Sequence, residues 1–298
     1  MSLQAKIVKK VLRLQFSGWS EGPIEEQRAR QEKSVRFARL PKGIHCQPVC
    51  ANGVSAEWIK APDADLGVIL YLHGGAYALG SINVHRELVA RLAHSTRMRA
   101  LAINYRLAPE HPYPAALSDA TMAYLWLLNE GVHPSKIIIA GDSAGGGLAL
   151  ATLVALRDAG ESLPAGAVCI SPWTDLALTG TSIQYKAKAD PILAPDDLEM
   201  YARYYAGEHE LSSPLISPFY ADLKDLPPLL MQVGADEILL DDAVRCADKA
   251  REAGVDVTLE IWNEMFHVFQ MIWFLAETKK AIVHIAEFVS RGLTSAAA

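Results

Sequence analysis

One five-residue motif, GDSAG at residues 141–145, constrains this sequence more than any other feature. It follows an apolar run at 137–140 that is typical of a buried β-strand, and an apolar helical pattern begins at Ala144. A strand that turns sharply into a helix holds the serine between them in a strained conformation, and flanking glycines avoid collisions across the turn. The helix N-terminus also favours a developing negative charge. The motif therefore predicts that Ser143 is a nucleophile at the carboxyl end of a strand.

Short apolar runs alternate with helical patterns along most of the chain. Runs that are apolar throughout fit strands buried on both faces, and alternating strands and helices give a doubly wound, mostly parallel α/β sheet. The expected strands are 68–72, 100–103, 137–140, 167–170, 229–233 and 257–261. The expected helices are about 82–94, 115–129, 144–159, 241–253 and 270–291.

Two stretches interrupt this alternation, residues 1 to about 33 and about 180 to 215. The first is expected to be helical, and the second carries Tyr185, Tyr201, Tyr204 and Tyr205 on weakly helical sequence. We expect both to pack as a cap over the carboxyl edge of the sheet, where open α/β folds bind ligands. The alternative is that both are surface insertions with no role at the site, but insertions of this length are uncommon unless they are functional. The 298 residues are expected to form one domain, 1–298, that includes this cap.

A second glycine-rich segment, HGGA at residues 73–76, follows the expected strand 68–72. Glycines directly after a strand allow backbone N–H groups to approach a ligand closely. The N–H groups of Gly74, Gly75, Ala76 and Ala144 are therefore the expected oxyanion hole, which would stabilise the tetrahedral intermediate of an acyl transfer. A plain turn is the alternative. It is the weaker interpretation because both motifs occur in the order that such a serine hydrolase requires.

The general base is expected among the histidines that follow the nucleophile. Of the nine histidines, three lie after Ser143, namely His209, His267 and His284. His284 falls within the apolar pattern of the last helix, and His209 lies between two glutamates in the second interrupting stretch. His267 comes shortly after a strand and before the last helix, in a loop at a strand end. We therefore predict that His267 is the base.

Four carboxylates could orient that base: Asp236, Glu237, Asp241 and Asp242. Asp236 comes three residues after the strand 229–233 and can lie on the same edge as Ser143. Asp241 and Asp242 fall where a helix begins, where capping and the helix dipole explain acidic residues. Glu237 is expected to point elsewhere. The predicted triad is Ser143, Asp236 and His267.

These motifs together resemble the hormone-sensitive-lipase family of bacterial esterases, which has the α/β-hydrolase fold. The resemblance rests on HGGA at 73–76, YRLAPEHPYPAA at 105–116, GDSAGGGLA at 141–149, SPWTDL at 171–176, and on Asp236 and His267. It implies an eight-stranded sheet, a helical cap built partly from the N-terminus, and hydrolysis of short acyl esters without a cofactor.

Two positions depart from the family pattern. The family usually has a third glycine where this chain has Ala76, and a glycine after the histidine where Val268 stands. Because an oxyanion hole uses backbone N–H groups, alanine can serve there if its φ stays negative. Val268 is the milder departure, since the chemistry requires only the imidazole of His267.

Composition and charge limit the other classes of function. The net charge is −6 and no cluster of five basic residues occurs, which argues against nucleic acid as a partner. No stretch approaches the roughly 18 apolar residues of a membrane span. The spacing of the four cysteines does not predict a zinc site, so we expect no metal and free, buried cysteines in a reducing cytoplasm. The family resemblance implies that no cofactor is needed.

The sequence therefore predicts a serine carboxylesterase that acts on a small-molecule ester, and it leaves open whether the chain forms a homodimer. A lactonase, a deacetylase or an amidase would use the same scaffold and triad. A ligand receptor derived from a lapsed hydrolase, as in the related plant gibberellin receptors, would lack a triad member. Here a serine, an acid and a histidine are all present.

Overall fold

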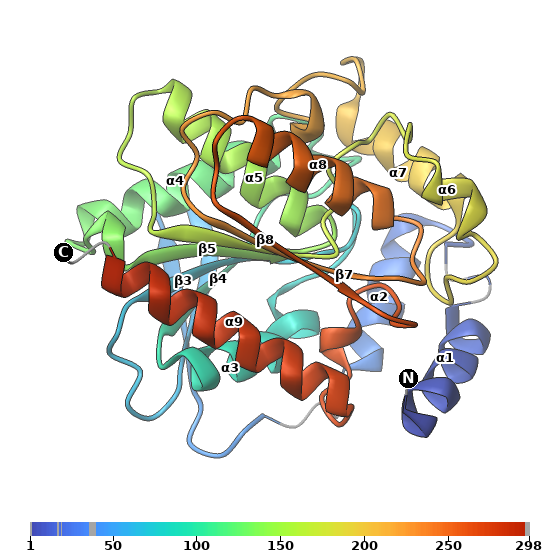
Figure 1. Ribbon diagram of the computed structural model, residues 1–298, viewed down its shortest axis with the longest axis horizontal. Helices are drawn as coiled ribbons and strands as arrows, with labels where there is room; N and C mark the ends of the chain where they lie inside the picture. The colour runs from blue at the N-terminus through green and yellow to red at the C-terminus, as the bar shows by residue number, and fades with distance from the viewer. Residues whose placement is uncertain (1, 17, 19, 36–39, 296–298) are drawn as a thin grey trace.

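In the computed structural model, eight strands of the described part of the chain form one sheet in the order β1-β2-β4-β3-β5-β6-β7-β8 (Figure 1). The structure describes residues 2–16, 18, 20–35 and 40–295. β1 pairs antiparallel with β2, and β2 with β4, whereas the remaining neighbours are parallel. The strands are β1 (His45–Ala51), β2 (Val54–Lys60), β3 (Val68–Leu72), β4 (Arg99–Asn104), β5 (Ile137–Asp142), β6 (Gly166–Ile170), β7 (Leu229–Gly234) and β8 (Val257–Trp262).

Helices cover both faces of the sheet, so the predicted doubly wound α/β sheet is confirmed. In Figure 1, α3 and α9 cover one face, while α4, α5 and α8 cover the other. The helices are α1 (Leu3–Phe16), α2 (Ile24–Ser34), α3 (Ile82–Thr96), α4 (Ala115–Asn129), α5 (Ala144–Asp158), α6 (Ser182–Tyr185), α7 (Pro195–Ala206), α8 (Leu240–Glu252) and α9 (Ala276–Ser295). Short 3₁₀ turns occur at η1 (Pro134–Lys136), η2 (Pro218–Tyr220) and η3 (Phe269–Met271).

Strand β3 shows why the central runs are apolar throughout. Successive side chains of a strand point to opposite faces of the sheet. Leu70 and Leu72 accordingly join the core beneath α4 and α5, whereas Ile69 and Tyr71 join the core beneath α3 and α9. A strand with helices on both sides therefore has no solvent-facing position for a polar residue, which is the pattern that predicted it.

The six strands predicted individually all form, and so does the eight-stranded sheet, but the start of one helix needs correction. Strands β1 and β2 were expected only through the family resemblance. β1 lies at the sheet edge with most of its side chains partly or fully exposed, so it lacks an apolar run. The helix predicted at 270–291 begins later, because the chain first forms η3 and a turn in which the N–H of Leu275 donates to Ile272.

The two stretches that interrupt the strand–helix alternation lie side by side beyond the strand ends, at the right of Figure 1. The Tyr201 hydroxyl of α7 donates to Gln27 Oε1 of α2 at 2.5 Å, and Arg13 of α1 donates to the Lys188 carbonyl at 2.6 Å. These contacts join residues that are far apart in the sequence. Among the described residues, no helix is both long enough and apolar enough to cross a membrane.

Candidate active site

Ser143 occupies the turn between β5 and α5, with φ 55° and ψ −123°. A β-carbon at Gly141 would collide with the carbonyl of Gly145, and one at Gly145 would collide with the carbonyl of Leu72. These two glycines are thus required by the close approach of backbone to backbone, as the motif predicted. The left-handed φ of a non-glycine residue is strained, and strain of this kind is concentrated at functional sites.

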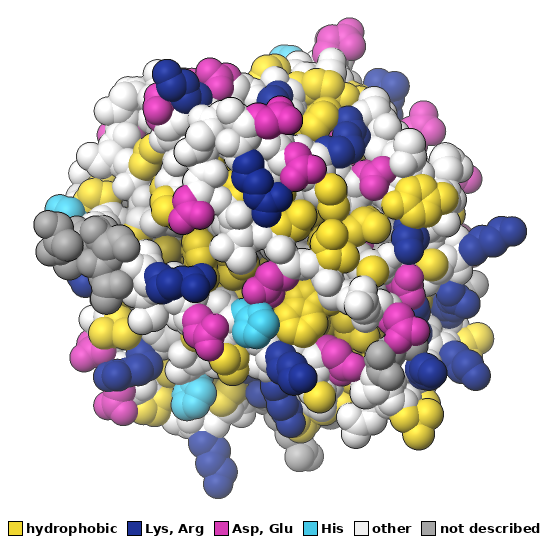
Figure 2. All heavy atoms as spheres, viewed as in Figure 1, with side chains coloured by type: hydrophobic (Ala, Val, Ile, Leu, Met, Phe, Trp, Pro, Cys, Tyr) yellow, Lys and Arg dark blue, Asp and Glu magenta, His cyan; other side chains and the backbone are white. Residues whose placement is uncertain are grey.

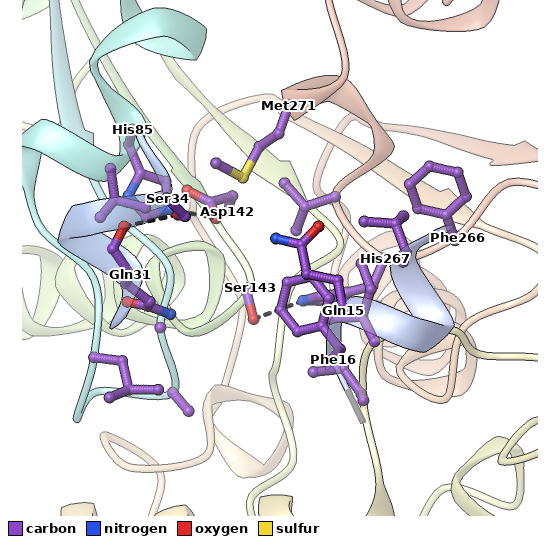
Figure 3. A pocket seen from close by; sticks show the side chains of 18 of the residues that line it. Gln15, Phe16, Gln31, Ser34, His85, Asp142, Ser143, Phe266, His267 and Met271 are labelled. Carbon is purple, nitrogen blue, oxygen red and sulfur yellow. Dashed lines mark hydrogen bonds and ion pairs between the residues drawn. The ribbon is translucent and has the colours of Figure 1, made fainter. Parts of the chain in front are cut away.

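The structure brings His267 to Ser143, as predicted. The Ser143 hydroxyl lies 2.9 Å from His267 Nε2, and the other ring nitrogen, Nδ1, donates to Glu237 Oε2 at 2.6 Å. Figure 3 shows the serine side chain directed at the imidazole. His267 and Glu237 are both buried. A serine, an imidazole and a carboxylate in one hydrogen-bonded chain can transfer the serine proton to the imidazole.

Asp236, the predicted orienting acid, does not reach the imidazole, and that assignment was wrong. Its carboxylate accepts a hydrogen bond from Lys9 Nζ at 2.6 Å and lies 3.5 Å from Lys186 Nζ. The N–H of Asp236 donates to the Met265 carbonyl. The side chain therefore faces the two interrupting stretches, on the opposite side of the loop from His267.

Glu237 takes the place expected for Asp236, so the expectation that it points elsewhere was also wrong. Its second oxygen, Oε1, accepts from the Ser171 hydroxyl at 2.8 Å and from the Gly234 N–H at 2.5 Å. The glutamate thus folds back across the end of β7. Adjacent loop residues often point in opposite directions, but nothing in the local sequence says which one points inward.

The pKa of His267 is set by opposing effects. Burial lowers this pKa. The Glu237 carboxylate, and to a smaller extent Asp190 and Asp142, raise it by more than burial lowers it, so the pKa of His267 lies above its ordinary value. The raised pKa means that Glu237 stabilises the imidazolium that forms when His267 takes a proton.

Asp190 is a buried residue of this region that the sequence analysis missed. Its Oδ2 accepts from the Ile238 N–H at 2.9 Å, and its Oδ1 accepts from the N–H groups of Ile192 and Leu193. Burial raises the pKa of Asp190. The aspartate fixes the residue after Glu237 to the second interrupting stretch. The Asp-Pro pair at 190–191 was the available signal, since it marks a turn.

One of the four N–H groups predicted for the oxyanion hole already has a hydrogen-bond partner. The N–H of Gly74 donates to Asp142 Oδ1 at 3.0 Å, which removes Gly74 from the set. Gly75 and Ala76 line the cavity beside Ser143, and Ala144 directly follows it. The N–H groups of Gly75, Ala76 and Ala144 have no acceptor among the described residues.

The two departures from the family pattern both lie at left-handed backbone positions. Ala76 has φ 52° and Val268 has φ 46°. The condition stated for alanine at position 76, a negative φ, is therefore not met. These angles explain physically why glycine is usual at both places, since a β-carbon destabilises the left-handed conformation by about 1–2 kcal/mol.

A buried network holds the oxyanion segment against the nucleophile turn. Asp142 Oδ1 accepts from the Tyr71 hydroxyl at 2.6 Å as well as from Gly74, and Asp142 Oδ2 lies 3.3 Å from His85 Nε2. His85 Nδ1 faces the Ser81 carbonyl at 3.0 Å. Because both ring nitrogens face acceptors, His85 is placed as an imidazolium. Burial lowers the pKa of His85, but Asp142 raises it by more.

A cavity of about 360 Å³ opens at Ser143 (Figure 3). Both interrupting stretches contribute to its wall, with Leu12, Gln15 and Phe16 from α1 and Leu198 and Tyr201 from α7.

Only one of the four tyrosines expected over the site, Tyr201, lines this cavity. Tyr205 instead stacks on Tyr77, with ring centroids 3.7 Å apart, and Tyr185 is exposed. Aliphatic side chains thus make up more of the cavity wall than aromatic side chains do.

Comparison with known proteins places this geometry in a family. Residues 69–271 match the family model described as the alpha/beta hydrolase fold. The chain is 42% identical over 287 residues to an acetyl-hydrolase of Streptomyces hygroscopicus, covering 94% of each protein. It is 41% identical over 250 residues to an esterase of Acinetobacter venetianus, covering 83% of this chain and 82% of that one.

Solved structures that resemble this chain are also esterases. The crystal structure of an esterase from the bacterial hormone-sensitive lipase family has a TM-score of 0.93 at 43% identity, covering 98% of this chain and 99% of that one. The structure of EstE5 soaked with p-nitrophenyl butyrate has a TM-score of 0.94 at 42% identity and covers 99% of this chain and 100% of that one. The chain therefore belongs to the α/β-hydrolase fold and, within it, to the hormone-sensitive-lipase family of bacterial esterases, and it is a carboxylesterase.

Proposed function

We propose that the chain hydrolyses short-chain acyl esters through an acyl-enzyme on Ser143, with His267 as general base and Glu237 as the orienting acid. The observation that carries this proposal is the hydrogen-bonded chain from Ser143 Oγ through His267 to Glu237. Each group has the partner that its role requires: the hydroxyl faces a nitrogen that can accept its proton, and the other nitrogen faces a buried carboxylate.

In the first half of the reaction, Ser143 Oγ attacks the ester carbonyl carbon while its proton moves to His267 Nε2. The carbonyl oxygen becomes an oxyanion, for which the N–H groups of Gly75, Ala76 and Ala144 are the proposed donors. Collapse of the intermediate breaks the bond to the alcohol oxygen, which leaves with the proton from His267. Ser143 then carries the acyl group.

In the second half, His267 takes a proton from water as the water oxygen attacks the acyl carbon. The same N–H groups bind the second oxyanion. His267 returns the proton to Ser143 Oγ as the acid leaves, which restores the starting state. Glu237 keeps the imidazole in one orientation and stabilises its cationic form throughout.

The size of the site supports a small acyl group. A cavity of about 360 Å³ lies near the lower end of the range for small-molecule sites, about 300–1,000 Å³. Both proposed cap segments line it, and they limit the depth available to an acyl chain. The relatives agree in kind, since one is named an acetyl-hydrolase and EstE5 was soaked with a butyrate ester.

The test combines active-site labelling with a substrate series. A fluorophosphonate should label Ser143, as mapped by mass spectrometry, and Ser143→Ala should lose about five to six orders of magnitude in kcat. Across p-nitrophenyl esters from acetate to palmitate, kcat/KM should be highest at butyrate or shorter. Labelling of another serine would overturn the mechanism, and a maximum at palmitate would overturn the chain-length proposal.

A further inference from the structure

Helix α1 has two apolar faces, and among the described residues only one of them is covered by other parts of the protein. On the inner face, Ala5 and Leu12 are buried against Phe266 and Phe269. On the outer face, Leu3, Ile7, Val11 and Leu14 are 74%, 56%, 54% and 81% exposed. Their spacing of four, four and three residues places them on one side of the helix. The outer stripe makes no contribution to the core.

Two exposed aromatic side chains lie near the start of this stripe. Trp273 and Phe274, 44% and 43% exposed, precede α9. The N–H of Ser2 donates to Glu277 Oε1 at 2.8 Å, which joins the start of α1 to the start of α9. Of eleven large apolar side chains exposed among the described residues, six belong to this α1 patch: Leu3, Ile7, Val11, Leu14, Trp273 and Phe274.

The charge of α1 differs from that of the rest of the chain. The helix carries Lys6, Lys9, Lys10 and Arg13 and no acidic residue, although the whole chain has a net charge of −6. Lys9 pairs with Asp236, and Arg13 donates to backbone carbonyls. Lys6 and Lys10 are exposed, with Glu264 the acidic group near Lys6. At the lower right of Figure 2, dark blue cationic side chains lie beside yellow apolar ones over α1.

We propose that the α1 patch docks on an anionic lipid surface. Exposed aliphatic side chains flanked by lysines are typical of helices that lie in the interface plane, with the apolar face in the acyl boundary and the cations among the headgroups. Tryptophan side chains such as that of Trp273 are enriched at the same level of the membrane, the interface between headgroups and acyl chains. A second copy of the chain fits the patch less well, because a two-fold contact would bring the cations of two α1 helices together.

Docking would place the proposed substrate cavity beside the lipid. The same helix contributes Leu12, Gln15 and Phe16 to the cavity wall. Esters dissolved in the lipid surface would therefore reach the site past α1. Binding to the surface does not itself depend on the proposed mechanism, so the two can fail separately.

The experiment is co-sedimentation of the full chain with vesicles of phosphatidylcholine, with or without phosphatidylglycerol. Binding should require phosphatidylglycerol and weaken with salt. Lys6→Gln with Lys10→Gln should lower the partition constant about 30-fold, at about 1 kcal/mol per lysine. Replacing Leu3, Ile7, Val11 and Leu14 with glutamine, a good helix former, should lower it about a hundredfold or more.

A matched control lies at the opposite edge of the sheet, near the start of β4, where Lys42, Lys60 and Leu66 are also exposed. Their triple replacement by glutamine should leave vesicle binding unchanged, and all variants should keep wild-type activity on soluble p-nitrophenyl butyrate. The lysine pair provides the test if the four-residue variant does not fold.

Three results would overturn the proposal. These are no binding to phosphatidylglycerol, equal binding to both vesicle types, or a loss of binding in the control as large as in the α1 variants. A dimer in sedimentation that the four-residue variant dissolves would assign the patch to a second copy instead.

Discussion

The nucleophile turn after β5 and the acid loop after β7 lie at the same edge of the sheet, yet they are determined in different ways. At the nucleophile turn, Gly141 and Gly145 are required by contacts within a few residues and with the neighbouring strand. In the acid loop, Lys9 and Lys186 hold Asp236 outward, while Ser171 and His267 hold Glu237 inward. Local sterics specify the first region, and remote contacts specify the second.

For this contrast, the largest expected effect on kcat comes from neutralising each of the two neighbouring acids, Asp236 and Glu237, in turn. Glu237→Gln should lower kcat by roughly three to four orders of magnitude, because its loss leaves the imidazole without an orienting charge. Asp236→Asn should change kcat less than about tenfold, since it breaks a partly exposed ion pair. The measurement is kcat for both variants at saturating p-nitrophenyl butyrate. A severe loss in Asp236→Asn with near-normal kcat in Glu237→Gln would reverse the assignment.

A second test addresses the network behind the nucleophile turn. Asp142→Ala removes both the charge opposite His85 and the acceptor of the Gly74 N–H, so Gly75 and Ala76 can shift. Displacement of such donors by about 1 Å can lower kcat about a hundredfold. Tyr71→Phe is the control, because it removes one hydrogen bond to Asp142 and keeps the charge. If both variants keep wild-type kcat, the network does not position the donors.

The pH dependence tests the electrostatic side of the acid loop. His267 must be neutral to accept the Ser143 proton, and its raised pKa keeps it protonated to higher pH. Activity should therefore fall as the pH drops through a midpoint above about 6.5. Glu237→Gln should move the residual activity's midpoint downward, because burial alone lowers the pKa. A wild-type midpoint below 6.5 in the kcat/KM profile would contradict this assignment.

The smallest expected effect concerns Ala76. Ala76→Gly should relieve the strain of the left-handed backbone. The larger entropy of glycine in the unfolded chain offsets part of this effect, so the free energy of unfolding should rise by about 0.5 kcal/mol. The melting temperature should rise by about 1–2 °C, with kcat within a few-fold of wild type. Gly75→Ala is the opposite control, since its β-carbon would meet the Leu79 carbonyl. A lower melting temperature in Ala76→Gly would refute the strain argument.

Much of the fold could be predicted from the sequence because burial on both faces leaves a readable apolar run. Ser143 and His267 were found because a steric motif and a short list of histidines restrict them. Glu237 was missed because side-chain direction in its loop depends on lysines and a serine elsewhere in the chain. Asp241 and Asp242 lie in the first turn of α8 as expected, but they bond Ser182 and Thr174 rather than their own helix.

The contact between the first helix and the last has a consequence for protein synthesis. Ser2 bonds Glu277, which is 275 residues further along the chain. At about 5–20 residues per second, a ribosome needs roughly 14–55 s to make that interval. During this time the inner face of α1, with Ala5 and Leu12, has no partner among residues 265–275. We therefore expect the nascent chain to bind chaperones through helix α1 and to complete the wall of its cavity only after residues 265–277 have been synthesised.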